Sequence, residues 1–231
     1  MSSLSRRYEV HHRLSRDGGD FVFVPERIPL LVAAVGGPGR RVLDLGCRSG
    51  AVTRHFVAGN DVVGLDVDPS ALRKAEALGI QTVVGDVEQP LPFGDASFDA
   101  VVAGELLEHL SDPAALVAEV RRVLRPGGTF VGSVPNAFRL KSRLVFLVGR
   151  EPDRDPTHLQ AFSPAGLQAL LRGFEEVRLA FVGGRFTRLH ARLLGRDLVF
   201  EARAPLAGAR AVPVLTHRRG DDARGDVRAV G

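Results

Sequence analysis

A glycine turn behind an acidic strand is the first feature of this chain that could support chemistry. In VLDLGCRSG, residues 42–50, Gly46 and Gly50 follow a short apolar run that contains Asp44. Glycine carries no side chain, so the backbone can turn sharply and a ligand can approach it closely. The spacing is G-x-x-x-G, not the G-x-G-x-x-G that seats a pyrophosphate on a helix N-terminus. The turn therefore favours a nucleoside without a diphosphate.

Two further acids end later apolar runs. Asp66 closes DVVGLD, twenty residues after Gly46, where a carboxylate can accept from both hydroxyls of a ribose. Asp86 closes QTVVGD, where it suits the exocyclic amine of a base, and a turn-forming aspartate is the alternative. Asp44 needs a partner within its apolar strand, and either a ligand ammonium or a neighbouring turn could supply one. A ligand with ribose, adenine and an amino group would satisfy all three acids.

The elements that must position these residues alternate between strands and helices. Apolar runs predict strands at residues 41–45, 61–66, 81–86, 98–103, 129–134, 174–184 and 196–204. Helices are predicted over 25–35, 50–58, 69–79, 113–124, 136–148 and 164–173, with caps at Asp68, Asp112 and Ser163. Strands that are apolar throughout imply a doubly wound α/β fold, with a mostly parallel sheet covered on both faces. Such a sheet binds ligands at the carboxyl ends of its strands.

Composition indicates one soluble domain. The chain has 231 residues, of which 45% are hydrophobic and 25% charged. The net charge of +4 is spread along the chain among acids, and aromatic residues are few, so a nucleic-acid partner is disfavoured. No apolar run is long enough for a transmembrane helix and no signal peptide is evident, so we expect a cytoplasmic protein.

The sequence predicts no metal site. Cys47 is the only cysteine, which excludes an internal disulfide and a cysteine-based metal site and fits a reducing compartment. His11 and His12 are adjacent, but no matching ligands accompany them.

Five segments in order resemble the successive motifs of the class I S-adenosylmethionine-dependent methyltransferases. They are VLDLGCRSG, VVGLDVDPS, VVGDVEQPLPF, FDAVVAGELLEHL and LRPGGTFVGSVPN. The resemblance covers about residues 25–180 and is greatest to the small-molecule branch that includes the ubiquinone-biosynthesis O-methyltransferases. It implies a seven-stranded Rossmann-like methyltransferase sheet with an antiparallel last strand, and S-adenosylmethionine as cofactor.

The resemblance also implies a cofactor site, formed by Asp44, Gly46, Gly50, Asp66, Val67, Asp86, Val87, Gly104 and Glu105. Gly46 and Gly50 would pass under the methionine moiety. Asp66 would hold the ribose, and Asp86 with the backbone of Val87 would hold the adenine.

The region around the methionine end contains one departure from the family. Gly104 and Glu105, after the fourth strand, would lie near this end of the cofactor. Arg48 stands where the family usually has glycine, and a positive φ there would cost about 1 kcal/mol. We expect Arg48 to adopt an ordinary conformation and to point to solvent or towards the substrate.

Two histidines are candidates for a general base. His109 lies in ELLEHL, where a structural histidine that ties its helix to the sheet is the alternative. His158 lies in the irregular insertion 136–162, a region that in this family often forms a lid over the substrate pocket. The basic and apolar segment 138–150 is predicted to be a lid helix packed on the sheet, and contact with a lipid surface is the alternative.

These observations predict three segments and one activity. Residues 1–24 would form a cap, residues 25–203 the methyltransferase domain, and residues 204–231 a disordered tail. The predicted activity is methyl transfer from S-adenosylmethionine to a small-molecule acceptor, most simply at an oxygen. A non-catalytic S-adenosylmethionine-binding protein with a regulatory or assembly role is the alternative, while a nicotinamide-dependent reductase is disfavoured because G-x-G-x-x-G is missing. The sequence leaves the oligomeric state open.

Overall fold

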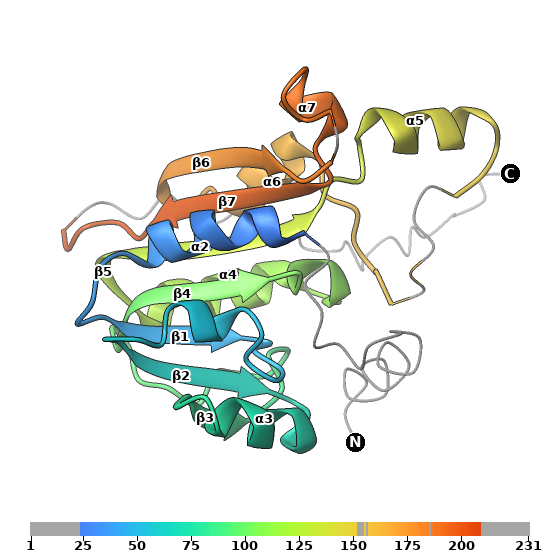
Figure 1. Ribbon diagram of the computed structural model, residues 1–231. Coiled ribbons are helices and arrows are strands. Elements are labelled where there is room, and N and C mark those ends of the chain that lie inside the picture. Colours follow the sequence, from blue (N-terminus) through green and yellow to red (C-terminus); the bar gives the residue numbers. More distant parts are fainter. Residues whose placement is uncertain (1–23, 152–154, 156, 185, 209–231) are drawn as a thin grey trace, which may run out of the picture.

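A single mixed sheet organises the protein (Figure 1). The computed structural model describes residues 24–151, 155, 157–184 and 186–208. The cap segment predicted over residues 1–24 and the tail predicted from residue 204 therefore lie almost wholly outside the described residues.

Seven strands form the sheet in the order β3-β2-β1-β4-β5-β7-β6. Their bounds are β1 Arg41–Leu45, β2 Asp61–Asp66, β3 Gln81–Val84, β4 Phe98–Gly104, β5 Leu124–Pro135, β6 Glu175–Val182 and β7 Asp197–Arg203. Neighbouring strands from β3 to β5 are parallel, and β7 is antiparallel to both β5 and β6. The predicted α/β fold with an antiparallel last strand is confirmed.

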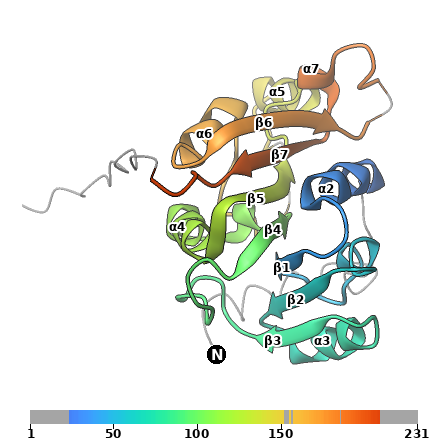
Figure 2. The same ribbon diagram turned by 90° about the vertical axis from the view of Figure 1, so that its left-hand side faces the viewer.

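Short helices connect the strands and cover both faces of the sheet. They are η1 Pro25–Arg27, α2 Ile28–Val35, η2 Thr53–His55, α3 Pro69–Glu76, η3 Leu107–His109, α4 Pro113–Val123, α5 Leu140–Leu147, α6 Pro164–Leu170 and α7 Ala191–Leu194. Figure 2 shows α2 and α3 on one side of the sheet, with α4 and α6 on the other. The predicted caps are confirmed, because Asp68, Asp112 and Ser163 each accept from backbone N–H groups of the helix they begin.

Alternation along β1 shows why its residues are buried on both sides. Leu43 and Leu45 join the core under α4 and α6, whereas Val42 joins the second core, which contains Leu31 of α2. Asp44 lies between these apolar neighbours and is itself only 4% exposed. The chain leaves β1 towards β2 on one side and returns to β4 on the other, so the strand order reverses at β1. This switch point is where open α/β sheets bind ligands.

Two local predictions differ from the structure. Residues 50–58 form turns and the single-turn helix η2 rather than a longer helix, and the hydroxyl of Thr53 bonds to Asp44 instead. Strand β5 begins at Leu124, so it includes residues 125–128, which lie between the predicted helix 113–124 and the predicted strand 129–134. Leu124 pairs with Phe98 before a register shift, so a bulge admits these residues to the sheet.

Helix α5 also differs from its prediction. The prediction that it packs on the sheet is wrong, because Ser142 is its only buried residue and it extends away from the sheet beside α7 (Figure 1). Phe146 and Leu147 are 73% and 78% exposed. Both faces of the sheet are already covered by other helices, and the cationic side chains of this segment favour water.

Candidate cofactor and active site

The glycine turn folds over the end of β2. Gly46 has φ +71° and Gly50 has φ +79°, so both adopt the left-handed conformation that glycine tolerates best. The amide of Gly46 donates to the carbonyl of Leu65 at 2.8 Å. A Cβ at Gly50 would lie 2.7 Å from the end of the Ile80 side chain, so even alanine there would require Ile80 to shift.

Arg48 corrects an expectation about this turn. Its φ is +51°, so the ordinary conformation expected for it is wrong. The backbone N–H of Arg48 donates to Asp66 Oδ2 at 3.0 Å, and this bond helps to hold the residue in the left-handed region. A non-glycine residue in this conformation costs on the order of 1–2 kcal/mol.

Asp66 links the glycine turn to the end of β2. The side chain is 2% exposed, and its Oδ1 accepts from the amide of Asp68 at 2.9 Å while Oδ2 accepts from Arg48. These two bonds orient the carboxylate at the turn. The structure thus brings together the turn and the acid that the ribose prediction requires.

Asp44 lies below the same turn. Its Oδ2 accepts from the Thr53 hydroxyl at 2.5 Å. Burial raises the pKa of Asp44 to about 7, with a further increase from the charge of Asp66 and an opposing effect of the Thr53 bond. The Thr53 bond agrees with a structural role for Asp44. A ligand ammonium beside Asp44 would favour the ionised carboxylate, so the structure is compatible with both predicted roles.

The turn after β3 carries the predicted adenine residues. Asp86 is half-buried, and its Oδ1 accepts from the amide of Glu88 at 2.9 Å, as in a turn-forming aspartate. Val87 is 5% exposed and belongs to the main core, and Val67 packs against that core. Because β3 pairs with β2, Asp86 follows the strand adjacent to the one that Asp66 ends.

The end of β4 holds a charged group that the sequence did not reveal. Glu105, directly after Gly104, has φ +53°, and its Oε1 accepts from the Ser133 hydroxyl at 2.8 Å. Arg27 Nη1 lies 3.2 Å from Glu105 Oε1 and 3.1 Å from Asp197 Oδ2. The only sequence signal for this group was the presence of Arg27 and Asp197 beside apolar runs, where a lone charge needs a partner.

Asp197 is the other perturbed acid of this group. Burial and, to a smaller extent, the charge of Glu105 raise its pKa to about 7, against the opposing effect of the nearby Arg27 guanidinium. Arg27, Glu105 and Asp197 therefore connect the N-terminal helix region to the ends of β4 and β7 through largely buried charges.

The two candidate bases lie in contact. The ring centroids of His109 and His158 are 4.8 Å apart in an edge-to-face arrangement. His109 Nδ1 lies 3.2 Å from both the carbonyl oxygen and the hydroxyl of Thr157. His158 Nε2 lies 3.8 Å from Asp155 Oδ2. The structure thus joins two residues that the sequence offered as separate alternatives, and it adds the buried carboxyl of Glu108 beside them.

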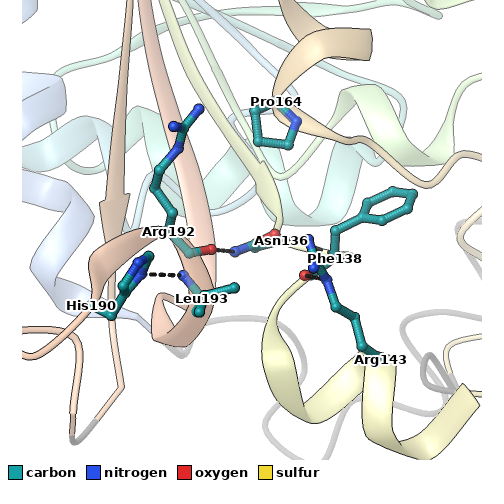
Figure 3. A pocket seen from close by; sticks show the side chains of 7 residues that line it. All are labelled: Asn136, Phe138, Arg143, Pro164, His190, Arg192 and Leu193. Carbon is teal, nitrogen blue, oxygen red and sulfur yellow. Dashed lines mark hydrogen bonds between the residues drawn. The ribbon is translucent and has the colours of Figure 1, made fainter. Parts of the chain in front are cut away.

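A separate cavity of about 300 Å³ lies between α5, α6 and α7 (Figure 3). Its lining residues are Asn136, Phe138, Arg143, Pro164, His190, Arg192 and Leu193. None of the predicted cofactor residues lines it. The Arg143 and Arg192 side chains extend in different directions in Figure 3, so they do not converge on one anion. Within the part of the chain that the structure describes, no helix is long and apolar enough to cross a membrane.

The fold and the glycine turn define a class: a doubly wound α/β protein with a glycine turn and acidic strand ends at its switch point. Residues 43–132 match the family model described as a methyltransferase domain. A Mycolicibacterium smegmatis protein named as a probable S-adenosylmethionine-dependent methyltransferase is 36% identical over 178 residues, which are 74% of this chain and 66% of that protein. The ubiquinone biosynthesis O-methyltransferase of Xanthomonas oryzae is 32% identical over 76% of this chain and 79% of its own length.

Solved structures share the fold. A Thermotoga maritima S-adenosylmethionine-dependent methyltransferase has a TM-score of 0.66 at 19% identity, covering 86% of this chain and 99% of its own. A Haemonchus contortus phosphoethanolamine N-methyltransferase, solved with S-adenosylmethionine, has a TM-score of 0.63 at 17% identity, covering 81% and 55%. The chain belongs to the S-adenosylmethionine-dependent methyltransferases. It is an enzyme of that class, and S-adenosylmethionine is its cofactor.

Proposed function

We propose that this methyltransferase transfers the methyl group of S-adenosylmethionine to an oxygen nucleophile of a small-molecule acceptor. The observation that carries the proposal is the contact between His109, in η3 shortly after β4, and His158, from the segment between α5 and α6. His109 thus lies near the edge at which such sheets bind ligands. A hydroxyl must lose its proton during methylation, and imidazole is the side chain best suited to accept it near neutral pH. The name of the Xanthomonas relative supports oxygen as the acceptor atom.

The cofactor-binding residues have distinct roles in this proposal. S-adenosylmethionine supplies a methyl group already activated on a sulfonium. Asp66 accepts from the ribose hydroxyls, Asp44 lies towards the ammonium, and Asp86 accepts from the adenine amine. Gly46 and Gly50 let the backbone approach the methionine moiety, with Gly104 and Glu105 at its far end. The chain then contributes mainly by holding the reactants in line and excluding water.

His109 is oriented for proton transfer. A carbonyl oxygen can only accept, so the 3.2 Å contact with Thr157 assigns a proton to His109 Nδ1. The lone pair is then on Nε2, which is the nitrogen that would accept the acceptor's proton. His158 is the second candidate, and its contact with His109 makes the pair the unit to test.

The alternative is a protein that binds S-adenosylmethionine without turnover, and Arg48 favours it. An arginine with φ +51° occupies the turn where the family usually has glycine. Tight cofactor binding with no product on a broad acceptor panel would support this alternative, and any methylated product would exclude it.

Calorimetry with S-adenosylmethionine and S-adenosylhomocysteine tests the cofactor site first. We expect micromolar binding by the wild type and at least tenfold weaker binding by Asp66→Ala. Asp66→Asn keeps one carbonyl acceptor for the turn and separates ligand contact from loss of the turn. Asp112→Ala is the matched control, because it removes an aspartate that caps α4. Equal binding by wild type and both Asp66 variants would contradict the assigned site.

An acceptor screen then tests the oxygen. Phenols, aliphatic alcohols and amines of similar size are compared by release of S-adenosylhomocysteine. We expect turnover on hydroxyl acceptors that falls at least a hundredfold in His109→Gln or His158→Gln, in line with the effect of general bases. Methylation of amines alone would contradict the proposal.

A further inference from the structure

Glu108, His109 and His158 bring three metal-ligand side chains together. Each offers one ligand atom, and these atoms all lie within 4.8 Å of one another. Glu108 and His109 lie in η3, directly after β4, while His158 comes from the segment between α5 and α6. The sequence predicts no metal here, because His158 follows the adjacent Glu108 and His109 only after about fifty residues, and this spacing matches no metal-binding motif.

The carboxyl of Glu108 points to a missing partner. Glu108 is 1% exposed, and neither of its oxygens has a hydrogen-bond partner among the described residues. Buried polar groups are almost always hydrogen-bonded, and a buried charge requires a counter-charge. The group therefore needs either a proton or a cation.

The histidines have the surroundings of metal ligands. The Thr157 carbonyl fixes the proton of His109 on Nδ1, which leaves Nε2 to donate its lone pair. Asp155 lies 3.8 Å from His158 Nε2, and its other oxygen accepts from the amide of Thr157 at 2.9 Å. Carbonyl and carboxylate groups behind an imidazole are the outer partners that orient metal-binding histidines.

We propose that Glu108, His109 and His158 bind a divalent transition-metal cation, with zinc as its chemical type. Two imidazoles and one carboxylate are the protein ligands of several catalytic zinc sites, which keep one position open. Imidazole ligands suit zinc rather than magnesium, which prefers oxygen. Ligand atoms of such a site lie about 3.4 Å apart, so the side chains must move closer by up to about 1.4 Å.

The open position would take the acceptor oxygen, and this part of the inference rests on the proposed function. A metal-bound hydroxyl loses its proton more readily. The imidazoles would then act as metal ligands in place of the general-base role given above, and the proton would pass to a water molecule. The acceptor class would then be a molecule whose nucleophilic hydroxyl can reach a metal.

Zinc binding to the full-length protein, stripped with chelator, tests the site. The parent carries His11→Gln and His12→Gln, so that nonspecific zinc binding to two adjacent histidines cannot contribute to the signal. Titration with zinc chloride by calorimetry should show one equivalent bound. Glu108→Gln and His158→Gln should each weaken binding at least tenfold, while His55→Gln, which removes an exposed histidine of η2, should leave it unchanged. Cobalt(II) absorption should appear in the parent and be lost in the same two variants.

Several results decide the proposal. Glu108→Gln keeps the shape and neutrality of the protonated acid, so its apo melting temperature should match that of the parent. Absence of zinc binding in the parent, or equal binding in all variants, would overturn the site. If methyl transfer ran at full rate without metal, the metal site would stand, but its proposed role in binding the acceptor oxygen would be refuted. Metal binding without turnover on any hydroxyl acceptor would count against the proposed function alone.

Discussion

Ionisation of Asp44 should destabilise the cofactor-free protein as the pH rises towards neutrality. Asp44 is 4% exposed, and burial raises its pKa from the ordinary 3.8 to about 7. Between these two values the folded protein keeps a proton on Asp44 that the unfolded chain has lost. The free energy of unfolding must therefore fall as the pH rises through this window and become level above about pH 7.

The size of the effect follows from the same values. Each tenfold change in an acid constant corresponds to about 1.4 kcal/mol, so the full window represents ~4 kcal/mol for this one carboxyl. Asp197, whose pKa is also about 7, should contribute a slope of the same sign. Asp44 and Asp197 should thus make the wild type markedly less stable at pH 8 than at pH 5.

Urea unfolding between pH 4 and pH 8 measures this slope. Asp44→Asn is neutral at every pH and can still accept from the Thr53 hydroxyl, so it should remove the share of the slope due to Asp44. Asp99→Asn is the control with the opposite sign. Burial alone would raise the pKa of Asp99, but hydrogen bonds from Arg41 and Arg125 lower it, so its contribution is lost as the pH falls. Parallel pH profiles for wild type and Asp44→Asn would refute the reasoning.

Three further predictions concern the turn, a helix cap and α5. Arg48→Gly should be more stable than Arg48→Ala, because both lose the guanidinium and only alanine keeps the backbone strain. The strain is worth about 1 kcal/mol, and the greater entropy of the unfolded glycine chain offsets part of it. Equal melting temperatures would contradict this prediction. Asp68→Ala should lose about 1 kcal/mol of stability in urea, while Asp68→Asn should retain most of it. If α5 contacts a lipid surface, wild type should sediment with phosphatidylglycerol vesicles, and Phe146→Ser with Leu147→Ser should reduce binding more than tenfold. Failure of the wild type to bind vesicles would leave α5 without this role.

Local signals were sufficient for most of the sheet and its caps. The apolar run at β1 and the Asp-Pro pair that begins α3 depend on neighbouring residues alone, and the structure has both where they were predicted. The family resemblance supplied the antiparallel β7. These features could be predicted because alternation, capping and proline act over a few residues.

Other features depend on contacts that no local pattern reveals. The positive φ of Arg48 is held partly by its hydrogen bond to Asp66. Residues 50–58 form turns instead of the expected helix, and Thr53 in this stretch donates to Asp44. The contact of His109 with His158 depends on where the chain places a segment about fifty residues away. Arg27 meets Asp197 across 170 positions of sequence. Such long-range pairs set the charges of the site, which is why the sequence indicated its chemistry but not its geometry.

The position of β7 has a consequence for synthesis of the chain. This strand is the last of the strands among the described residues, yet it lies inside the sheet and hydrogen-bonds to β5 and β6. Until it has been made, β6 has no neighbour in the sheet and β5 keeps an open edge, which is the kind of edge that pairs with other chains. A ribosome that stops before Asp197 would thus release a product with two unsatisfied strands, and such products should depend on chaperones or be degraded.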